Sequence, residues 1–290
     1  MRDKHYQEEQ MRHKEGYFKG ARGINSYYQH WLPEDEPKAI LLVVHGLAEH
    51  CGRYMNVVNH FAPSGYAVFG IDHIGHGKSD GERVYVDRFQ DYIDTLKIYF
   101  DMIRDWHPDI PVIMIGHSMG GLIGAAYLLE HQQELSAAVL SGPSVKVPDD
   151  ISKTVIFAGK VLSILMPKAG IIQLEADGVS SDPDVVDAYV NDPLVFTGKV
   201  TARLGAEMIK TMQHVTEKAP EISLPIMIVQ GSADRLVDPG GAQLLYDLAG
   251  SADKTIQIYD GFYHEVFNEP DHLQVLNDVQ QWIEAHLAAR

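Results

Sequence analysis

Two hydrophobic patterns alternate along this chain, short apolar runs and longer segments with apolar residues at helical spacing. Apolar runs without charged residues are typical of strands buried on both faces of a sheet, and we expect such strands at 39–44, 67–71, 111–115 and 137–140. Helical spacing predicts helices at 54–63, 86–106 and 118–130. Strands that alternate with helices predict an α/β fold, in which a mostly parallel central sheet is flanked by helices.

A long interruption divides this alternation. Residues 144–218 contain several helical patterns and proline-marked turns but no strand–turn–helix cycle. The cycle then resumes with a strand at 225–230, a helix at 240–249, a strand at 255–259 and a final helix from Pro270. We therefore expect 1–143 and 219–290 to form one core, and 144–218 to form an inserted, mainly helical cap. The cap is expected over the carboxyl ends of the strands, where open α/β sheets bind ligands. Residues 17–31 predict an additional hairpin before the first buried strand.

Composition and charge exclude several classes of protein. The 290 residues carry 24 basic and 40 acidic side chains, a net charge of −16, without a basic run. Nucleic-acid binding depends on Lys and Arg that neutralise phosphates, so we expect no nucleic-acid partner. The only cysteine, Cys51, excludes an intrachain disulfide. Residues 1–15 lack the apolar segment of a secretory signal, which favours a cytoplasmic location. No sequence feature predicts an obligate protein partner.

The candidate nucleophile is Ser118. Residues 116–120 fit G-x-S-x-G, a sharp strand-to-helix turn that exposes a serine hydroxyl. A pattern with three fixed positions also arises by chance, but here a predicted strand precedes it and a predicted helix follows it, which is the context the motif requires. The new helix directs its positive end toward the serine.

A serine hydroxyl needs a histidine to accept its proton, and that histidine needs a carboxylate to fix its tautomer. In folds with this elbow the order is Ser, Asp or Glu, His. Asp234 follows the strand at 225–230, and His264 follows the strand at 255–259. The rival Asp238 precedes Pro239 and resembles a helix cap. The rival histidines are those of the final helix, His272 and His286.

Acyl transfer also needs two N–H donors for the developing oxyanion. One is expected from Met119, directly after the nucleophile, and the other from the loop after the 39–44 strand, where we assign it to Leu47.

Several longer motifs resemble the monoacylglycerol lipases of the α/β-hydrolase superfamily, over nearly the whole chain beyond residue 15. They are HGLAEHCGRY at 45–54, DHIGHGKSDGER at 72–83, GHSMGG at 116–121 and QGSADR at 230–235, with further matches at 191–194 and 253–264. The resemblance implies an α/β-hydrolase fold and hydrolysis of a glycerol monoester of a long-chain fatty acid, without a cofactor. It also implies that Glu49, Arg53 and the cap residue Tyr189 hold the glycerol end.

Two of these residues have a simpler reading, and one position departs from the pattern. Taken alone, Glu49 and Arg53 would be a surface ion pair worth about 0–1 kcal/mol. Mammalian members of the family carry a second histidine three residues after the catalytic one, whereas this chain has Phe267. Head-group selectivity is therefore expected to differ.

Two further stretches admit more than one interpretation. Asp72, His73 and His76 have side chains that suit zinc, but no further protein ligand is assigned, and we expect a loop held by its own hydrogen bonds and no metal. Residues 155–166 of the cap are apolar on nearly every face, with Lys160 and Lys168 at the boundary. They predict lining of an acyl tunnel, and our hypothesis adds transient contact with a membrane or micelle surface, which would make the protein peripheral to membranes.

The sequence thus predicts a carboxylic ester hydrolase with a small lipid ester as substrate. A broader carboxylesterase or lysophospholipase with the same triad is one alternative. A non-catalytic lipid-binding protein on this scaffold is the other, since a fold does not by itself give a function.

Overall fold

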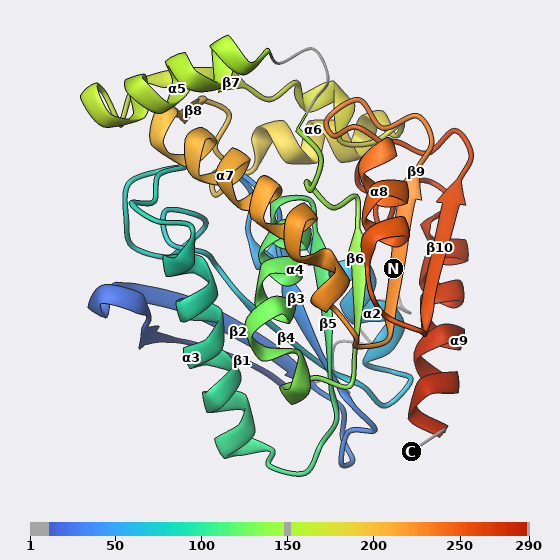
Figure 1. Ribbon diagram of the computed structural model, residues 1–290. Coiled ribbons are helices and arrows are strands. Elements are labelled where there is room, and N and C mark those ends of the chain that lie inside the picture. Colours follow the sequence, from blue (N-terminus) through green and yellow to red (C-terminus); the bar gives the residue numbers. More distant parts are fainter. Residues whose placement is uncertain (1–11, 148–151, 289–290) are drawn as a thin grey trace.

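A twisted sheet runs through the centre of the protein (Figure 1), whose computed structural model describes residues 12–147 and 152–288. Part of the polar N-terminal stretch, 1–11, and part of the 144–218 insertion, 148–151, lie outside the described residues. The sheet has the strand order β1-β2-β4-β3-β5-β6-β9-β10. The strands are β1 (Arg12–Lys19), β2 (Asn25–Leu32), β3 (Ile40–Val44), β4 (Ala67–Ile71), β5 (Val112–His117), β6 (Ala137–Ser141), β9 (Ile226–Gly231) and β10 (Lys254–Tyr259).

The pairing confirms the expected sheet. All neighbouring pairs from β4 to β10 are parallel, while β1–β2 and β2–β4 are antiparallel. The hairpin β1–β2 was expected but is longer than predicted, and the short 3₁₀ turn η1 (Ala21–Gly23) joins its strands. Parallel strands place their carboxyl ends at the same edge, so the loops after β3, β5, β9 and β10 come together there.

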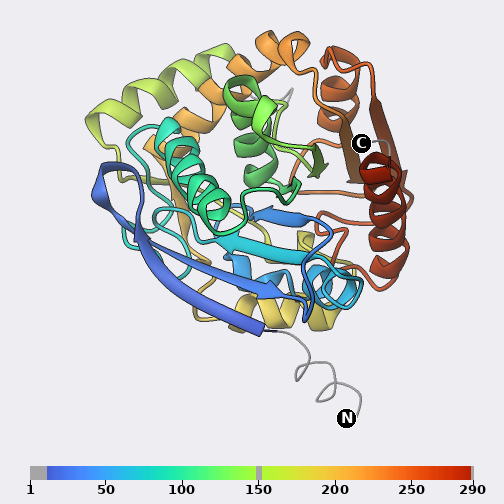
Figure 2. The same cartoon turned by 90° about the horizontal axis from the view of Figure 1, so that it is seen from below.

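Helices cover both faces of the sheet (Figure 2). Successive side chains of a strand point to opposite faces, so Ile40 and Leu42 of β3 belong to one hydrophobic core and Leu41 and Val43 to the other. The first core contains side chains of α3 (Gln90–Trp106), α4 (Met119–His131) and α8 (Gly240–Leu248). The second contains side chains of α2 (Met55–Phe61) and α9 (His272–Ala288). Burial on both faces explains why the predicted strands are continuous apolar runs.

Most of the insertion lies beyond the carboxyl ends of the strands, while its last helix runs from there down beside α4 (Figure 1). Its helices are α5 (Lys153–Leu165), α6 (Pro183–Asn191) and α7 (Ala202–Lys218). A two-stranded antiparallel sheet, β7 (Gly170–Gln173) with β8 (Lys199–Thr201), was not expected from the sequence. The remaining 3₁₀ turns of the described chain are η2 (Cys51–Arg53), η3 (Gln132–Glu134), η4 (Ala176–Gly178) and η5 (Ala219–Glu221).

Helix α3 begins four residues later than predicted, because its approach segment is bound to α7 and β8. The Thr201 hydroxyl donates to the carbonyl of Val84 (2.7 Å), and Arg203 Nε donates to the carbonyl of Asp87 (2.8 Å). The amide of Phe89 donates to the Glu207 carboxylate. An earlier helical turn would need the Asp87 carbonyl and the Phe89 amide for its own hydrogen bonds. None of the helices in the described parts of the chain is long and apolar enough to cross a membrane.

Candidate active site

The turn at Ser118 joins β5 to α4 and has the geometry of a nucleophile elbow. Ser118 has φ 56° and ψ −119°, a conformation that costs energy for a residue with a side chain and persists only when its surroundings enforce it. Its amide donates to the carbonyl of Ser141 on β6 (2.9 Å). A Cβ on Gly116 would lie 2.6 Å from the carbonyl oxygen of Gly120, and one on Gly120 would overlap the carbonyl of Val44. Both glycines of the motif are therefore required by close backbone packing.

His264 and Asp234 meet at the carboxyl edge of the sheet. His264 Nδ1 lies 2.7 Å from Asp234 Oδ2, and both residues are buried. Asp234 also accepts hydrogen bonds from the Gln230 side chain (2.8 Å) and from the amides of Leu236 and Val237 (2.8 and 3.1 Å). Burial alone would raise the pKa of Asp234, but the hydrogen bonds from His264 and the two amides hold it below its ordinary value. The carboxylate is thus kept charged beside the ring.

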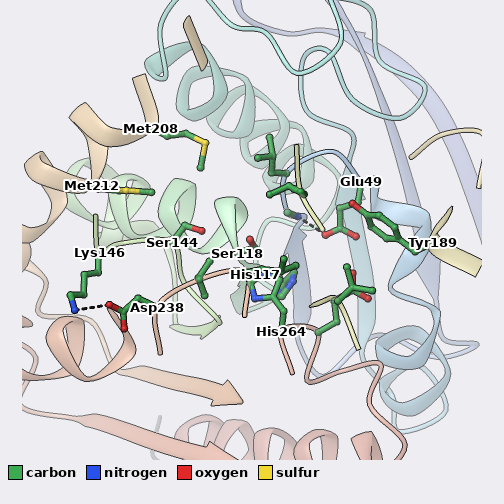
Figure 3. Close-up of a pocket in the computed structure, with 17 residues that line it drawn as sticks. Glu49, His117, Ser118, Ser144, Lys146, Tyr189, Met208, Met212, Asp238 and His264 are labelled. Carbon is green, nitrogen blue, oxygen red and sulfur yellow. Dashed lines mark hydrogen bonds and ion pairs between the residues drawn. The ribbon is translucent and has the colours of Figure 1, made fainter. Parts of the chain in front are cut away.

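The Ser118 hydroxyl and the His264 ring border the same pocket (Figure 3). In the described structure no hydrogen bond joins the two side chains in this conformation. Catalytic hydrogen bonds are often long or poorly aligned before substrate binds and tighten only in the complex. Because Nδ1 of His264 contacts Asp234, Nε2 is the ring nitrogen that remains available for a hydrogen bond in the pocket.

The rival residues are engaged elsewhere. Asp238 binds Lys146 (2.6 Å) and accepts from the amide of Gly240 (2.8 Å) near the start of α8. His272 contacts the carbonyl of Glu269, and His286 contacts Asp253.

The two expected oxyanion donors come from two separate segments at the carboxyl edge of the sheet. Leu47 follows β3, and Met119 is the first residue of α4. Neither backbone N–H has an acceptor among the described residues. For Met119 this follows from helix geometry, because the first four amides of a helix have no partner within the helix.

Glu49, Arg53 and Tyr189 form a buried cluster, which corrects the reading of a surface ion pair. The Arg53 side chain is 10% exposed and that of Glu49 4%. Arg53 Nη1 donates to Glu49 Oε2 (2.9 Å), and the guanidinium lies 4.6 Å from the centre of the Tyr189 ring. Glu265, whose involvement was not predicted from the sequence, accepts hydrogen bonds from both terminal nitrogens of Arg53, at 2.5 and 2.8 Å.

The Arg53 guanidinium therefore binds two buried carboxylates, those of Glu49 and Glu265. Burial raises the pKa of Glu49, and the negative charge of Glu265 raises it further, although the positive charge of Arg53 acts in the opposite direction. Burial also disfavours the charged form of Glu265, but its two hydrogen bonds from Arg53 hold its pKa below the ordinary value. Tyr54 donates its hydroxyl to Glu49 Oε1 (2.8 Å). Only the position of Glu265 next to His264 could have indicated its involvement.

The pocket has a polar end, and on the other side of Ser118 it combines apolar side chains with Ser144 and the Lys146–Asp238 ion pair (Figure 3). Glu49 and Tyr189 stand at one end and Met208 and Met212 lie toward the other, with Ser118 and His264 between them (Figure 3). Leu174, Val179 and Leu236 add to the apolar wall. The residues of the insertion that line it come from its first segment after β6, from α6 and α7, and from the segment after β7. The expectation that 155–166 lines the tunnel is thus not met in this conformation, where Phe157 and Ile164 of α5 are exposed.

The sequence and the fold of this chain are matched by known proteins. The profile of the family described as "Serine aminopeptidase, S33" matches residues 35–271. The monoacylglycerol lipase of Mycolicibacterium smegmatis is 40% identical over 93% of this chain and 96% of its own. The chain belongs to the monoacylglycerol lipase family of α/β-hydrolases.

Solved structures agree with this membership. The monoacylglycerol lipase of Paleococcus ferrophilus superposes with a TM-score of 0.78 at 26% identity, covering 95% of this chain and 100% of the other. A carboxyl esterase of Bacillus coagulans in complex with glycerol gives a TM-score of 0.84 at 26% identity, covering 96% and 99%. The predicted α/β-hydrolase fold is confirmed.

The motif at 72–83 that contributed to the resemblance forms a loop held by its own hydrogen bonds. The Asp72 carboxylate accepts from the amides of Cys51 (2.9 Å) and Lys78 (2.8 Å). His73 Nε2 contacts the carbonyl of His45 (3.1 Å), and His76 Nδ1 contacts the carbonyl of Ile74 (3.0 Å). These contacts fix the loop behind the Gly46–Leu47 segment.

Proposed function

We propose that this protein is a serine hydrolase that cleaves monoacylglycerol into a free fatty acid and glycerol, through an acyl-enzyme on Ser118. The observation that supports it best is the Asp234–His264 pair beside the elbow, in a pocket with Glu49 and Tyr189 at one end and Met208 and Met212 toward the other. Such a pocket suits an amphiphilic ester whose carbonyl lies between the two ends. Membership of the monoacylglycerol lipase family supports the same substrate class.

The proposed reaction uses the geometry of each residue. Ser118 Oγ attacks the ester carbonyl while His264 Nε2 takes the hydroxyl proton, and Asp234 stabilises the resulting imidazolium. The oxyanion accepts hydrogen bonds from the backbone N–H groups of Leu47 and Met119. His264 then gives its proton to the glycerol oxygen, which leaves. Water, activated by the same ring, attacks the acyl-enzyme and releases the fatty acid.

We assign the glycerol end to Glu49 and Tyr189, which line the pocket, with Arg53 behind them. Carboxylate and phenol oxygens can accept and donate the hydrogen bonds that two glycerol hydroxyls require. Phe267, 4% exposed and beside Glu49 and Glu265, brings no hydrogen-bonding side chain to this end. Head-group selectivity then depends on the Glu49 cluster alone.

We also propose that 144–218 acts as a cap whose α5 face contacts a lipid surface. Helical spacing places the exposed side chains of Phe157, Val161 and Ile164 along one side of α5. Val155, Leu165 and Met166 are also exposed on or next to this helix, as are Ile171 and Ile172 of β7. Exposed apolar side chains gathered in this way mark an interaction site. The substrate is itself a membrane-soluble lipid, and Lys160 and Lys168 can remain at the polar boundary.

A panel of esters tests the substrate. Turnover is measured for long-chain monoacylglycerol, diacylglycerol, lysophosphatidylcholine and p-nitrophenyl butyrate. We expect the highest kcat/KM for monoacylglycerol. Dominant turnover of lysophosphatidylcholine would instead indicate a lysophospholipase, and equal turnover of all esters a general carboxylesterase. A protein that neither hydrolyses any of them nor reacts with a fluorophosphonate would be a lipid-binding protein.

A further inference from the structure

The catalytic histidine loop and the proposed oxyanion loop are far apart in sequence, yet buried side chains connect them. Glu265 directly follows His264 and binds Arg53 through both carboxylate oxygens. Arg53 in turn binds Glu49, whose Oε1 accepts the backbone N–H of Gly46 at 2.6 Å. Gly46 immediately precedes Leu47, the proposed donor to the oxyanion.

The contacts of the series Glu265–Arg53–Glu49–Gly46 join largely buried groups. The side chains of Glu265, Arg53 and Glu49 are 6%, 10% and 4% exposed, so solvent screens their charges little. The contact of Glu265 with Arg53 is bidentate, which fixes the guanidinium plane as well as its position. Asn268 Nδ2 donates to Glu265 Oε2 (2.8 Å) and holds the carboxylate from the other side.

The series ends against the nucleophile. A Cβ on Gly46 would lie 2.8 Å from Glu49 Oε1 and 3.2 Å from Ser118 Cβ, so the peptide at Gly46 fits closely between these two residues. The hydrogen bond to Glu49 fixes the His45–Gly46 peptide, and only the φ and ψ of Gly46 separate this peptide from the Leu47 N–H. The hydrogen bond from Gly46 to Glu49 (Figure 3) is therefore a constraint on the oxyanion donor.

We propose that Glu265 is a positioning residue that acts through Arg53 and Glu49 to hold the Leu47 amide in place for the oxyanion. The role rests on the proposed function, because it requires that Leu47 donates to an oxyanion formed on Ser118. Because Glu265 binds Arg53 through both carboxylate oxygens, it fixes the position from which Arg53 binds Glu49. Without that anchor, Glu49 and the Gly46–Leu47 peptide gain freedom to move.

The test compares Glu265→Gln with the wild-type protein on two substrates, a monoacylglycerol and p-nitrophenyl butyrate, which has no glycerol. Rates are expressed per active site titrated with a fluorophosphonate, so that unfolded protein does not enter the comparison. We expect kcat to fall by roughly 10- to 100-fold on both substrates, the size associated with a misplaced catalytic group. We expect KM for the glycerol-free ester to be nearly unchanged.

A second readout addresses the oxyanion directly. A trifluoromethyl ketone adds Ser118 Oγ to its carbonyl carbon, His264 takes the hydroxyl proton, and the carbonyl oxygen becomes an oxyanion at the proposed donors. The inhibition constant should rise in Glu265→Gln by the same factor as kcat falls. Glu265→Asp, which keeps the charge, should recover part of both losses.

Glu269→Gln is the matched control. Glu269 is a buried carboxylate on the same segment, but it binds Ser181 and does not contact Arg53. It should leave kcat and the inhibition constant within about twofold of the wild-type values. If Glu265→Gln does not fold, Glu49→Gln breaks the same series at its other end and is expected to lose kcat on both substrates.

The outcomes separate the two proposals. A change confined to KM for monoacylglycerol would show that Glu265 serves glycerol binding, and an unchanged kcat on both esters would show that it positions nothing. Either result overturns the positioning role while hydrolysis by the wild-type protein persists. Failure of the wild-type protein to turn over either ester would instead overturn the proposed function.

Discussion

The imidazole of His264 presents Nδ1 to Asp234 at 2.7 Å, and the Asp234 carboxylate is held by three further hydrogen bonds. This arrangement fixes the tautomer in which Nε2 is free to accept a proton. In the mechanism we propose, Asp234 therefore acts by its charge and its position, while the proton moves between Ser118 and His264.

Asp234→Asn should keep the fold and reduce kcat by roughly 10³- to 10⁴-fold, because an amide can stabilise the wrong tautomer and not the imidazolium. Asp238→Asn, the rival position, breaks the bond to Lys146 and should cost less than about tenfold. Steady-state hydrolysis of p-nitrophenyl butyrate measures both. A larger loss for Asp238→Asn would reverse the assignment.

Ser118→Ala should reduce kcat by roughly 10⁶-fold and abolish labelling by a fluorophosphonate, since the proposed acyl-enzyme forms on this hydroxyl. The substitution also removes no hydrogen bond that the Ser118 side chain makes within the described residues. The melting temperature is therefore expected to stay the same or rise slightly. Labelling that persists in Ser118→Ala would place the nucleophile elsewhere.

The sequence alone could predict the position of a residue when that position depends on a single strand. The strands are continuous apolar runs because both faces are buried, and Ser118, Asp234 and His264 each come just after a strand whose carboxyl end meets the others. Glu265 could not be predicted as a partner of Arg53, because a contact across 212 positions leaves no spacing pattern. The strand β7 is exposed along its length and so shows no alternation of apolar and polar residues.

Gly120→Ala should destabilise the protein by about 2–3 kcal/mol or more, because the new Cβ would overlap the carbonyl oxygens of Val44 and His45 on the neighbouring strand end. Backbone atoms can move less readily than a side chain to relieve such an overlap. Gly159→Ala in α5 is the control, since a Cβ there meets nothing within 4 Å. That substitution should stabilise the helix by about 0.5–1 kcal/mol. Urea unfolding at neutral pH compares the two.

Stability should fall as the solution is acidified below about pH 6.5. Burial lowers the pKa of His73 to about 3, of His76 to about 4 and of His117 to about 3. An unfolded chain has histidine pKa values near 6.5, so between pH about 6.5 and 4 it binds protons that the native protein does not. Each such histidine lowers the free energy of unfolding by about 1.4 kcal/mol per pH unit.

These three residues contribute a slope of about 4 kcal/mol per pH unit within this window, and His30 and His45, whose pKa values burial lowers in the same way, steepen it further. Urea unfolding at pH 7, 6 and 5 measures it. His76→Gln keeps a donor for the carbonyl of Ile74 and should reduce the slope by about 1.4 kcal/mol per pH unit, the contribution of one histidine. An unchanged slope in this variant would mean that His76 titrates alike in both states.

Contact of the α5 face with lipid can be separated from catalysis, because its exposed side chains do not line the pocket. Phe157→Ser with Ile164→Ser removes two side chains that are 68% and 73% exposed. Losing their apolar area should weaken association with phosphatidylcholine vesicles by at least about tenfold. Turnover of p-nitrophenyl butyrate in solution should stay within about twofold of the wild-type value, since Ser118, His264 and the pocket wall are unchanged.

The matched control removes apolar side chains of similar exposure from other faces. Tyr17 on β1 is 59% exposed and Leu273 on α9 is 57% exposed. If general surface hydrophobicity drives vesicle binding, Tyr17→Ser with Leu273→Ser will weaken it as much as the α5 pair does. If α5 is the contact, only the α5 pair will do so, and hydrolysis of vesicle-borne monoacylglycerol will fall with it. Equal partitioning of all three proteins would show that the cap makes no lipid contact.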